Sequence, residues 1–204
     1  MVRRLMSTPR YKADLGGGSL NLAESRVVAN LLLEQTDHER WHHAIEIENV
    51  LQRRSPATAR RLAILLRGRL RTMDSELWQM VRSGSTTVAF HAVFAATIKH
   101  SFLLGDFLDL VIRNQFRLFR TDLPRNLWAE YLEECRNRDP YMPTWLESTA
   151  AKQGDTAYRI LAEIGYLADR KSYQLQPVRI SADVLSYLHS SDERYVLRCI
   201  QVSQ

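Results

Sequence analysis

The sequence contains little cysteine. Its 204 residues include only two cysteines, Cys135 and Cys199, and neither belongs to a Cys-x-x-Cys pair. This excludes a disulfide framework and a cysteine zinc site, and it is typical of proteins in a reducing compartment. We therefore expect a cytoplasmic protein in which both cysteines are small apolar residues.

Long hydrophobic runs are also missing. The longest uncharged stretch, residues 83–98, has 16 residues and is interrupted by Ser, Thr and His91. A membrane-spanning helix needs about 20 predominantly apolar residues. The charged residues 1–10 have no apolar segment behind them, so no secretory signal is predicted. We expect a protein without membrane contact.

Catalytic signatures are scarce. The chain has no Gly-x-Ser-x-Gly elbow, no phosphate loop of the Gly-Lys-Ser/Thr kind and no dinucleotide fingerprint. Residues 38–42 have the His-Glu-x-x-His form, in which both histidines would bind zinc and Glu39 would act as base. Arg40 would place a cation beside that metal, and no third ligand follows, so we predict no metal site.

A second polar group contains Asp106, Asp109, Arg113 and Arg117. It has no nucleophile and no third orienting group, so we interpret it as a structural ion-pair seam. We predict a protein that is not an enzyme, with no catalytic residue, no cofactor and no small-molecule substrate.

Positive charge, by contrast, is concentrated in one segment. The formal net charge is +5, which favours anionic partners. Between Leu51 and Met73 there is no acidic residue and no lysine, but there are seven arginines: Arg53, Arg54, Arg60, Arg61, Arg67, Arg69 and Arg71. Guanidinium groups match phosphate oxygens two at a time, which favours a phosphate-binding surface.

The same segment predicts a helix that begins at Pro56. Ser55 is a good N-cap, and proline fits the first helical position. The helical period places one apolar stripe on the buried side: Ala59, Leu62, Ala63, Leu66 and Leu70. Arg60, Arg67 and Arg71 return beside this stripe, while Arg61 and Arg69 point elsewhere.

An upstream helix capped by Asp37 would bury Trp41, Ala44 and Ile45. Two helices joined by a short turn, the second carrying arginines, have the outline of a helix-turn-helix. For this segment alone, a solvated helix whose arginines pair with acids elsewhere is an equal alternative.

The rest of the chain also predicts helices. Residues 1–18 are expected to form an N-terminal arm, residues 19–139 a helical domain and residues 140–204 a C-terminal unit, with Asp139-Pro140 at the boundary. Asn21 and Glu24 resemble a capping box. The segment from Leu103 to Phe119 is the most apolar, and its Leu118 and Phe119 are expected to be buried.

The C-terminal unit has two open interpretations. Residues 144–152 predict one helix, Asp155 a second, and residues 173–180 a short extended ribbon with a basic tip at Arg170 and Lys171. Helix, helix and ribbon resemble a winged helix with one β-hairpin, whereas a plain helical hairpin with a loop fits equally well. Pro177 restricts any such strand to an edge.

Several blocks of sequence carry a family resemblance. They are residues 17–20, 24–26, 48–51, 54–59, 103–107 and 138–140, together with the block Arg159 to Leu167. In this order they resemble the BrxA family of bacterial BREX phage-defence systems over roughly residues 11–188. The resemblance implies a mostly helical, compact NusB-like bundle that binds DNA, lacks catalytic activity and works with other BREX proteins.

We therefore predict a DNA-binding accessory component of a BREX anti-phage system that grips duplex DNA with low sequence preference. The predicted contacts are Arg53, Arg54, Ser55, Thr58, Arg60, Arg61, Arg67 and Arg71, with a second, weaker surface at Lys152, Arg159, Arg170 and Lys171. RNA binding of the NusB type is one alternative, disfavoured because the aromatic residues considered fall on apolar faces. A protein adaptor within the BREX complex is the other.

Overall fold

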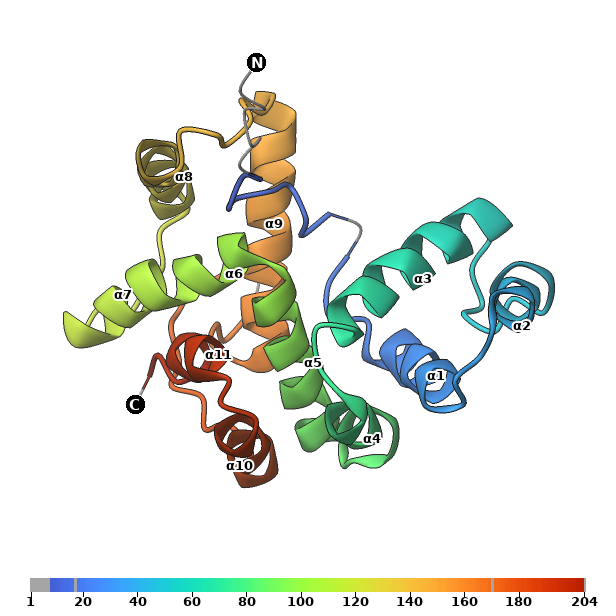
Figure 1. The fold of residues 1–204 in the computed structure, drawn as a ribbon. Coiled ribbons are helices and arrows are strands. Elements are labelled where there is room, and N and C mark those ends of the chain that lie inside the picture. Colours follow the sequence, from blue (N-terminus) through green and yellow to red (C-terminus); the bar gives the residue numbers. More distant parts are fainter. Residues whose placement is uncertain (1–7, 17, 170, 204) are drawn as a thin grey trace, which may run out of the picture.

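The chain is mostly helical, as the sequence predicts (Figure 1). The computed structural model describes residues 8–16, 18–169 and 171–203. Its α-helices are α1 (Leu22–Leu33), α2 (His38–His42), α3 (Pro56–Leu70), α4 (Ser75–Ser83), α5 (Thr86–His100), α6 (Phe102–Asp106), α7 (Arg113–Arg117), α8 (Asn126–Arg138), α9 (Glu147–Ile164), α10 (Ala182–Ser190) and α11 (Arg194–Ile200). Two π-helical segments, η1 (His43–Ile47) and η2 (Phe107–Ile112), continue α2 and join α6 to α7.

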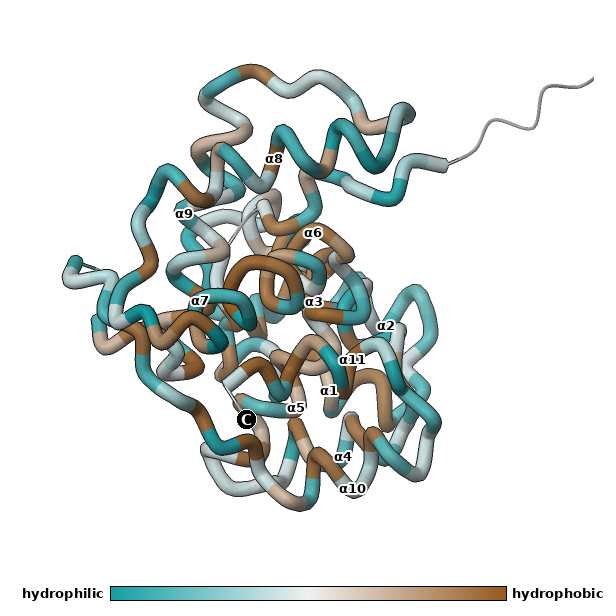
Figure 2. The backbone as a smooth tube through the Cα atoms, turned by 90° about the vertical axis from the view of Figure 1, so that its left-hand side faces the viewer, coloured by the Kyte–Doolittle hydropathy of each residue, from teal (hydrophilic) through white to brown (hydrophobic). Residues whose placement is uncertain are grey.

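Helix α5 lies at the centre of the molecule. Every residue from His91 to Ile98 is buried, and this helix contacts α3 and α4 on one side and α9 and α11 on others. The small residues Ala92, Ala95 and Ala96 let neighbouring helices approach closely. In Figure 2, brown, hydrophobic stretches of the tube gather in the interior around α6. One hydrophobic cluster extends from Tyr11 to Val202, so the two predicted domains share a core.

Several predicted helix starts are confirmed. Ser55 caps α3, with its Oγ accepting the Thr58 backbone N–H at 3.3 Å, and Pro56 occupies the first position. Asp37 caps α2 through its carboxylate, as predicted, and Asp74 caps α4 in the same way. The predicted apolar stripe of α3 is buried throughout, because the 3.6-residue period fixes which side chains share a face.

The capping box predicted at the start of α1 is not formed. Asn21 has a left-handed backbone, with φ of 48°, and its side chain donates a hydrogen bond to the Ser19 carbonyl at 2.9 Å. Glu24 is turned toward Arg53, with which it forms an ion pair. A long-range charge partner therefore replaces the local contact that the sequence pattern suggests.

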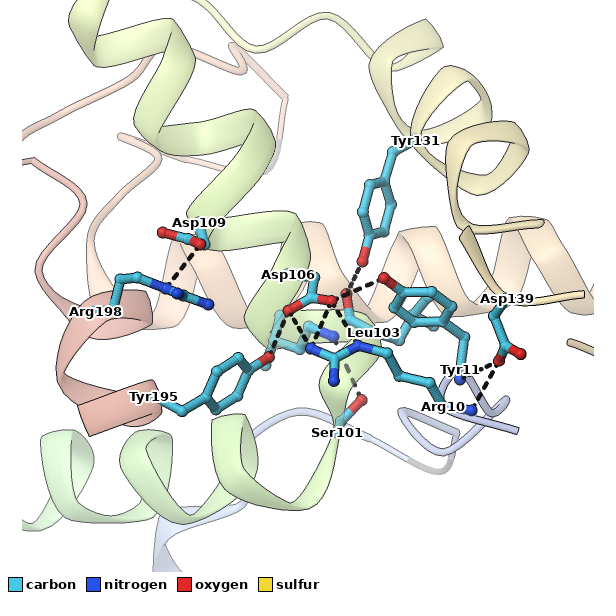
Figure 3. A network of polar contacts seen from close by, with 11 residues as sticks. Arg10, Tyr11, Ser101, Leu103, Asp106, Asp109, Tyr131, Asp139, Tyr195 and Arg198 are labelled. Carbon is cyan, nitrogen blue, oxygen red and sulfur yellow. Dashed lines mark hydrogen bonds and ion pairs between the residues drawn. The ribbon is translucent and has the colours of Figure 1, made fainter. Parts of the chain in front are cut away.

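The described residues before α1, which are 8–16 and 18–21, pack against the rest of the fold. Tyr11, Leu15 and Leu20 are almost completely buried. Asp106 at the end of α6 holds this segment: it accepts hydrogen bonds from the Arg10 guanidinium at 2.9 and 3.0 Å and from the Tyr11 hydroxyl at 2.8 Å (Figure 3). The hydroxyl of Tyr195 on α11 donates to the same carboxylate at 2.8 Å.

The helical segment from Phe102 to Arg117 departs from the prediction at its far end. Leu118 and Phe119 were expected in the core, but they are 55% and 92% exposed. The π-helical stretch inserts an extra residue into the turn, which rotates every later side chain around the axis. Helix α7 then projects away from the core (Figure 1).

The C-terminal unit also differs from its prediction. Residues 147–164 form the single helix α9, and Asp155, expected to begin a second helix, forms a surface ion pair with Arg125. Gly165 ends α9 with a φ of 97°, a conformation that glycine adopts without strain.

The expected β-hairpin is replaced by two isolated antiparallel bridges within the described residues. These bridges join Asp122 to Gln174 and Leu167 to Leu175. The extended segment therefore pairs briefly with two different parts of the chain.

No single helix among the described residues is long and apolar enough to cross a membrane. Helices α5 and α6–α7 together have the required length and composition, but they meet at a bend of 103°.

Candidate nucleic-acid interface

A cleft of about 540 Å³ opens beside the first turns of α3. Its lining residues come from three separate parts of the chain: Gly16, Asn21, Arg53, Thr58, Arg61, Leu62, Leu65 and Lys152. Four of the predicted DNA contacts therefore meet at one place, and three of these four carry positive charge. We call this surface the basic cleft.

The turn before α3 fixes one wall of the basic cleft. Asn49 has a φ of 52°, and its side-chain amide donates to the Arg53 carbonyl at 2.8 Å and accepts the Arg53 backbone N–H at 2.9 Å. The Thr58 hydroxyl lies 3.0 Å from the Ser55 hydroxyl. These contacts hold the exposed first turn of α3, where the helix dipole favours anions.

The seven arginines of the segment have different surroundings. Arg53 pairs with Glu24, and Arg60 pairs with Glu46 at 2.9 Å. Arg54, Arg61 and Arg71 are exposed and make no ion pair with a described residue. The acids that the segment lacks are thus supplied from elsewhere for two arginines, whereas three cations remain available.

Arg67 and Arg71 lie at a second hollow, away from the basic cleft. The Arg67 guanidinium sits 4.3 Å from the centre of the Trp41 ring, and both arginines line a pocket of about 360 Å³ with Trp41 and Trp78. Burial lowers the pKa of Arg67, and the neighbouring charge of Arg71 lowers it further. The predicted contacts in and next to α3 therefore divide into two groups. Arg53, Thr58 and Arg61 line the basic cleft, and Arg67 and Arg71 line the second hollow.

Arg69 has a structural role. It was expected to point away from the side of α3 that carries Arg60, Arg67 and Arg71. It is 1% exposed, and its Nη1 donates to the Ser19 carbonyl at 2.9 Å. Burial lowers its pKa to about 10, and nearby Asp14 and Glu163 oppose that shift. Its spacing of seven residues from Leu62 and three from Leu66 was the available signal, since those positions share the buried stripe.

The described residues of the predicted second surface, Lys152, Arg159 and Lys171, lie at different places. Lys152, near the start of α9, joins the basic cleft. Arg159 is half-buried further along α9 and does not line that cleft, and Lys171 lies in the exposed turn after α9. Arg170 lies outside the described residues.

The two clusters considered as catalytic sites have structural partners. Asp109 pairs with Arg113 at 3.0 Å and Arg198 at 2.9 Å, which extends the predicted seam to α11. His42 lies 3.7 Å from Glu46. In the described part of the chain, no group of three or more His, Cys, Asp or Glu side chains is arranged to hold a metal ion.

The fold and the basic cleft define a mostly helical protein with a cationic surface built from α3, α9 and the turn before α3. The chain belongs to the BrxA family, whose model matches residues 9–192.

Curated relatives named BREX protein BrxA cover most of the chain. One from Paramagnetospirillum magneticum (strain ATCC 700264 / AMB-1) is 66% identical over 97% of this chain and 100% of its own length. Another from Escherichia coli O9:H4 (strain HS) is 33% identical over 92% of this chain and 88% of its own length. A crystal structure of an uncharacterized protein from Magnetospirillum magneticum matches with a TM-score of 0.90 at 64% identity, covering 96% of this chain and all of that chain.

Proposed function

We propose that this chain is a BREX component with a role in phage defence that binds duplex DNA through the basic cleft. The observation that carries the proposal is the meeting of Arg53, Arg61 and Lys152 around one opening, although Lys152 lies about 90 residues further along the chain. Cations gathered in this way neutralise successive phosphates and release their counterions.

The wall of the basic cleft favours contact with the DNA backbone over base reading. Its cations are two arginines and one lysine, and the Thr58 hydroxyl adds an uncharged donor. Such groups position a protein on the duplex without carrying sequence information. Low sequence preference follows.

The helix-turn-helix belongs to this proposal with one modification. The connection from the end of η1 at Ile47 to the start of α3 at Pro56 comprises residues 48–55, whereas the usual motif has a turn of about three or four residues. Helix α3 is supported by η1 and α1, so it has the packing of a second helix laid on a first. The NusB-like arrangement is likewise part of the proposal.

The test is the affinity of the purified protein for a short duplex at several salt concentrations. Each phosphate contact removed should reduce the slope of log K against log salt by about 0.9. Arg61→Ala and Lys152→Ala should each flatten the slope, and their double variant should flatten it about twice as much. Arg194→Ala removes one exposed positive charge at the start of α11, where Arg194 pairs with Asp192, and serves as the control.

Two outcomes would reject the basic cleft as the DNA surface. One is an absence of duplex binding at low salt. The other is an Arg61→Ala variant whose slope equals that of Arg194→Ala, because the loss of one net charge alone would then explain the effect.

A protein adaptor is the second candidate. Ile47 and Ile64 are 65% and 63% exposed near the arginines of α3, and apolar side chains beside arginine are typical of protein interfaces. Charge reversal at Arg60 and Arg61 separates the two candidates. Loss of assembly with other BREX proteins while duplex binding persists would favour the adaptor.

A further inference from the structure

Phe119, just beyond α7, has both a solvent-exposed aromatic ring and a left-handed backbone, and each is unfavourable for phenylalanine. It is 92% exposed, and its φ is 52°. Its backbone N–H donates to the Phe116 carbonyl at 3.0 Å, and the Arg120 N–H donates to the Gln115 carbonyl at 3.0 Å. This pair of bonds is the Schellman motif, whose left-handed position favours glycine and disfavours a bulky residue.

Tyr173 provides a comparison, because it also has a left-handed backbone, with φ of 53°. Its ring packs edge-on against Tyr158 at 5.6 Å, and Arg125 donates to its hydroxyl at 3.3 Å. Packing therefore accounts for Tyr173. No ring contact links Phe119 to another described residue, so neither packing nor backbone preference accounts for phenylalanine there.

The backbone around Phe119 is firmly held. The Leu123 N–H donates to the Tyr173 carbonyl at 2.9 Å, and the Leu175 N–H donates to the Thr121 carbonyl at 2.9 Å. The exposed ring is thus carried between a helix end and a paired segment. A side chain presented in this fixed way loses little conformational freedom when it binds a ligand.

Exposed cations lie next to Phe119 in the chain. Arg117 and Arg120 are exposed and make no ion pair with any described residue, and Leu118 beside them is 55% exposed. Lys171 lies in the turn that precedes the segment paired with Thr121 and Asp122. We call residues 117–120 the α7 tip.

We propose that the α7 tip binds unpaired nucleotides, with the Phe119 ring stacked on a base and Arg117 and Arg120 on the adjoining phosphates. Proteins bind single strands by stacking bases on exposed aromatic rings and by contacting the backbone with cations. This works for any sequence, because every base has a π-face and every nucleotide linkage carries a phosphate. The inference rests on the proposed nucleic-acid binding but concerns a separate surface. Helix α7 and helix α3 project on opposite sides of α5 (Figure 1).

The experiment uses the whole chain and fluorescence anisotropy with three probes. The probes are an oligothymidylate and an oligouridylate of about 15 nucleotides, and a blunt duplex of similar length. Phe119→Ala should weaken binding to the single strands by about 5- to 150-fold, the effect of losing one stacked base. Phe119→Trp should bind at least as tightly as wild type. The relative affinities for the two single strands distinguish DNA from RNA.

Two variants serve as controls. Phe119→Leu keeps an apolar side chain but has no π-face, so it should behave like Phe119→Ala. Tyr141→Ala removes an aromatic side chain that is 64% exposed between α8 and α9, and it should leave binding unchanged.

Three results would overturn the inference. Phe119→Ala could bind single strands as wild type does; Phe119→Leu could retain full affinity; or Phe119→Ala could change only the sedimentation mass, which would assign the α7 tip to a protein contact. Duplex binding that still depends on Arg61 would keep the proposed function intact in each case. Loss of all duplex binding in wild type would instead reject the proposed function.

Discussion

Asp106 offers the sharpest test of what holds the residues before α1 in place. Its carboxylate is 5% exposed and accepts four hydrogen bonds, two from Arg10 and one each from Tyr11 and Tyr195. Asp106→Ala would leave two tyrosine hydroxyls without an acceptor, at about 1–3 kcal/mol each. The Arg10 side chain is 44% exposed, so water can replace most of the hydrogen bonds that it loses. Loss of the Arg10–Asp106 ion pair therefore adds less than about 1 kcal/mol.

The expected decrease in the free energy of unfolding is therefore about 2–7 kcal/mol, measured by urea denaturation. Proteolysis within residues 8–16 should become faster, because Tyr11 loses its anchor. A second variant, Asp106→Leu/Tyr11→Phe/Tyr195→Phe, removes the two tyrosine hydroxyls together with their acceptor. It should be more stable than Asp106→Ala.

Two results would refute this reasoning. One is a loss below about 1 kcal/mol in Asp106→Ala, which is the value for an ordinary exposed ion pair. The other is a triple variant as unstable as Asp106→Ala, which would mean that unsatisfied hydroxyls are not the source of the cost.

Three further predictions concern stability. Phe119→Gly should raise the free energy of unfolding by about 1 kcal/mol, because glycine adopts a left-handed backbone without strain; a decrease in the urea midpoint would contradict this. Gly105→Ala should cost at least about 2 kcal/mol, because an added Cβ would lie 2.2 Å from the Tyr195 hydroxyl and displace it from Asp106; wild-type stability would show that the helix shifts freely. Burial lowers the pKa values of His91 and His100 below the usual 6.5, so the unfolded chain binds protons more readily. Stability should therefore be full above that pH and decline as the pH falls below it, and the His91→Gln/His100→Gln variant should show a smaller decline.

Local signals in the sequence predicted most of the helices. The starts at Ser55 and Asp37 were identifiable because a capping side chain acts on residues next to it. The buried stripe of α3 followed from periodicity alone. Phe119 was misplaced because a π-helical segment, η2, leaves no clear mark in the pattern of apolar residues, yet it rotates everything after it.

The candidate site was predicted only in part, for a related reason. The arginine cluster is a feature of composition, and three of the predicted contacts in that segment, Arg53, Thr58 and Arg61, line the basic cleft. Which arginines remain available depends on acids such as Glu24 and Glu46, supplied by other helices. The approach of Lys152 to α3 is likewise a tertiary contact that no local pattern contains.

The attachment of the residues before α1 also constrains the order in which this protein can fold during synthesis. Leu15 donates its N–H to Gln153, and Leu20 donates its N–H to Glu163, across 138 and 143 positions of sequence. These two backbone N–H groups therefore lack their acceptors until α9 has emerged from the ribosome. Contacts of such high sequence separation slow folding, and a fragment ending at Asp139 would leave the Leu15 and Leu20 N–H groups without Gln153 and Glu163.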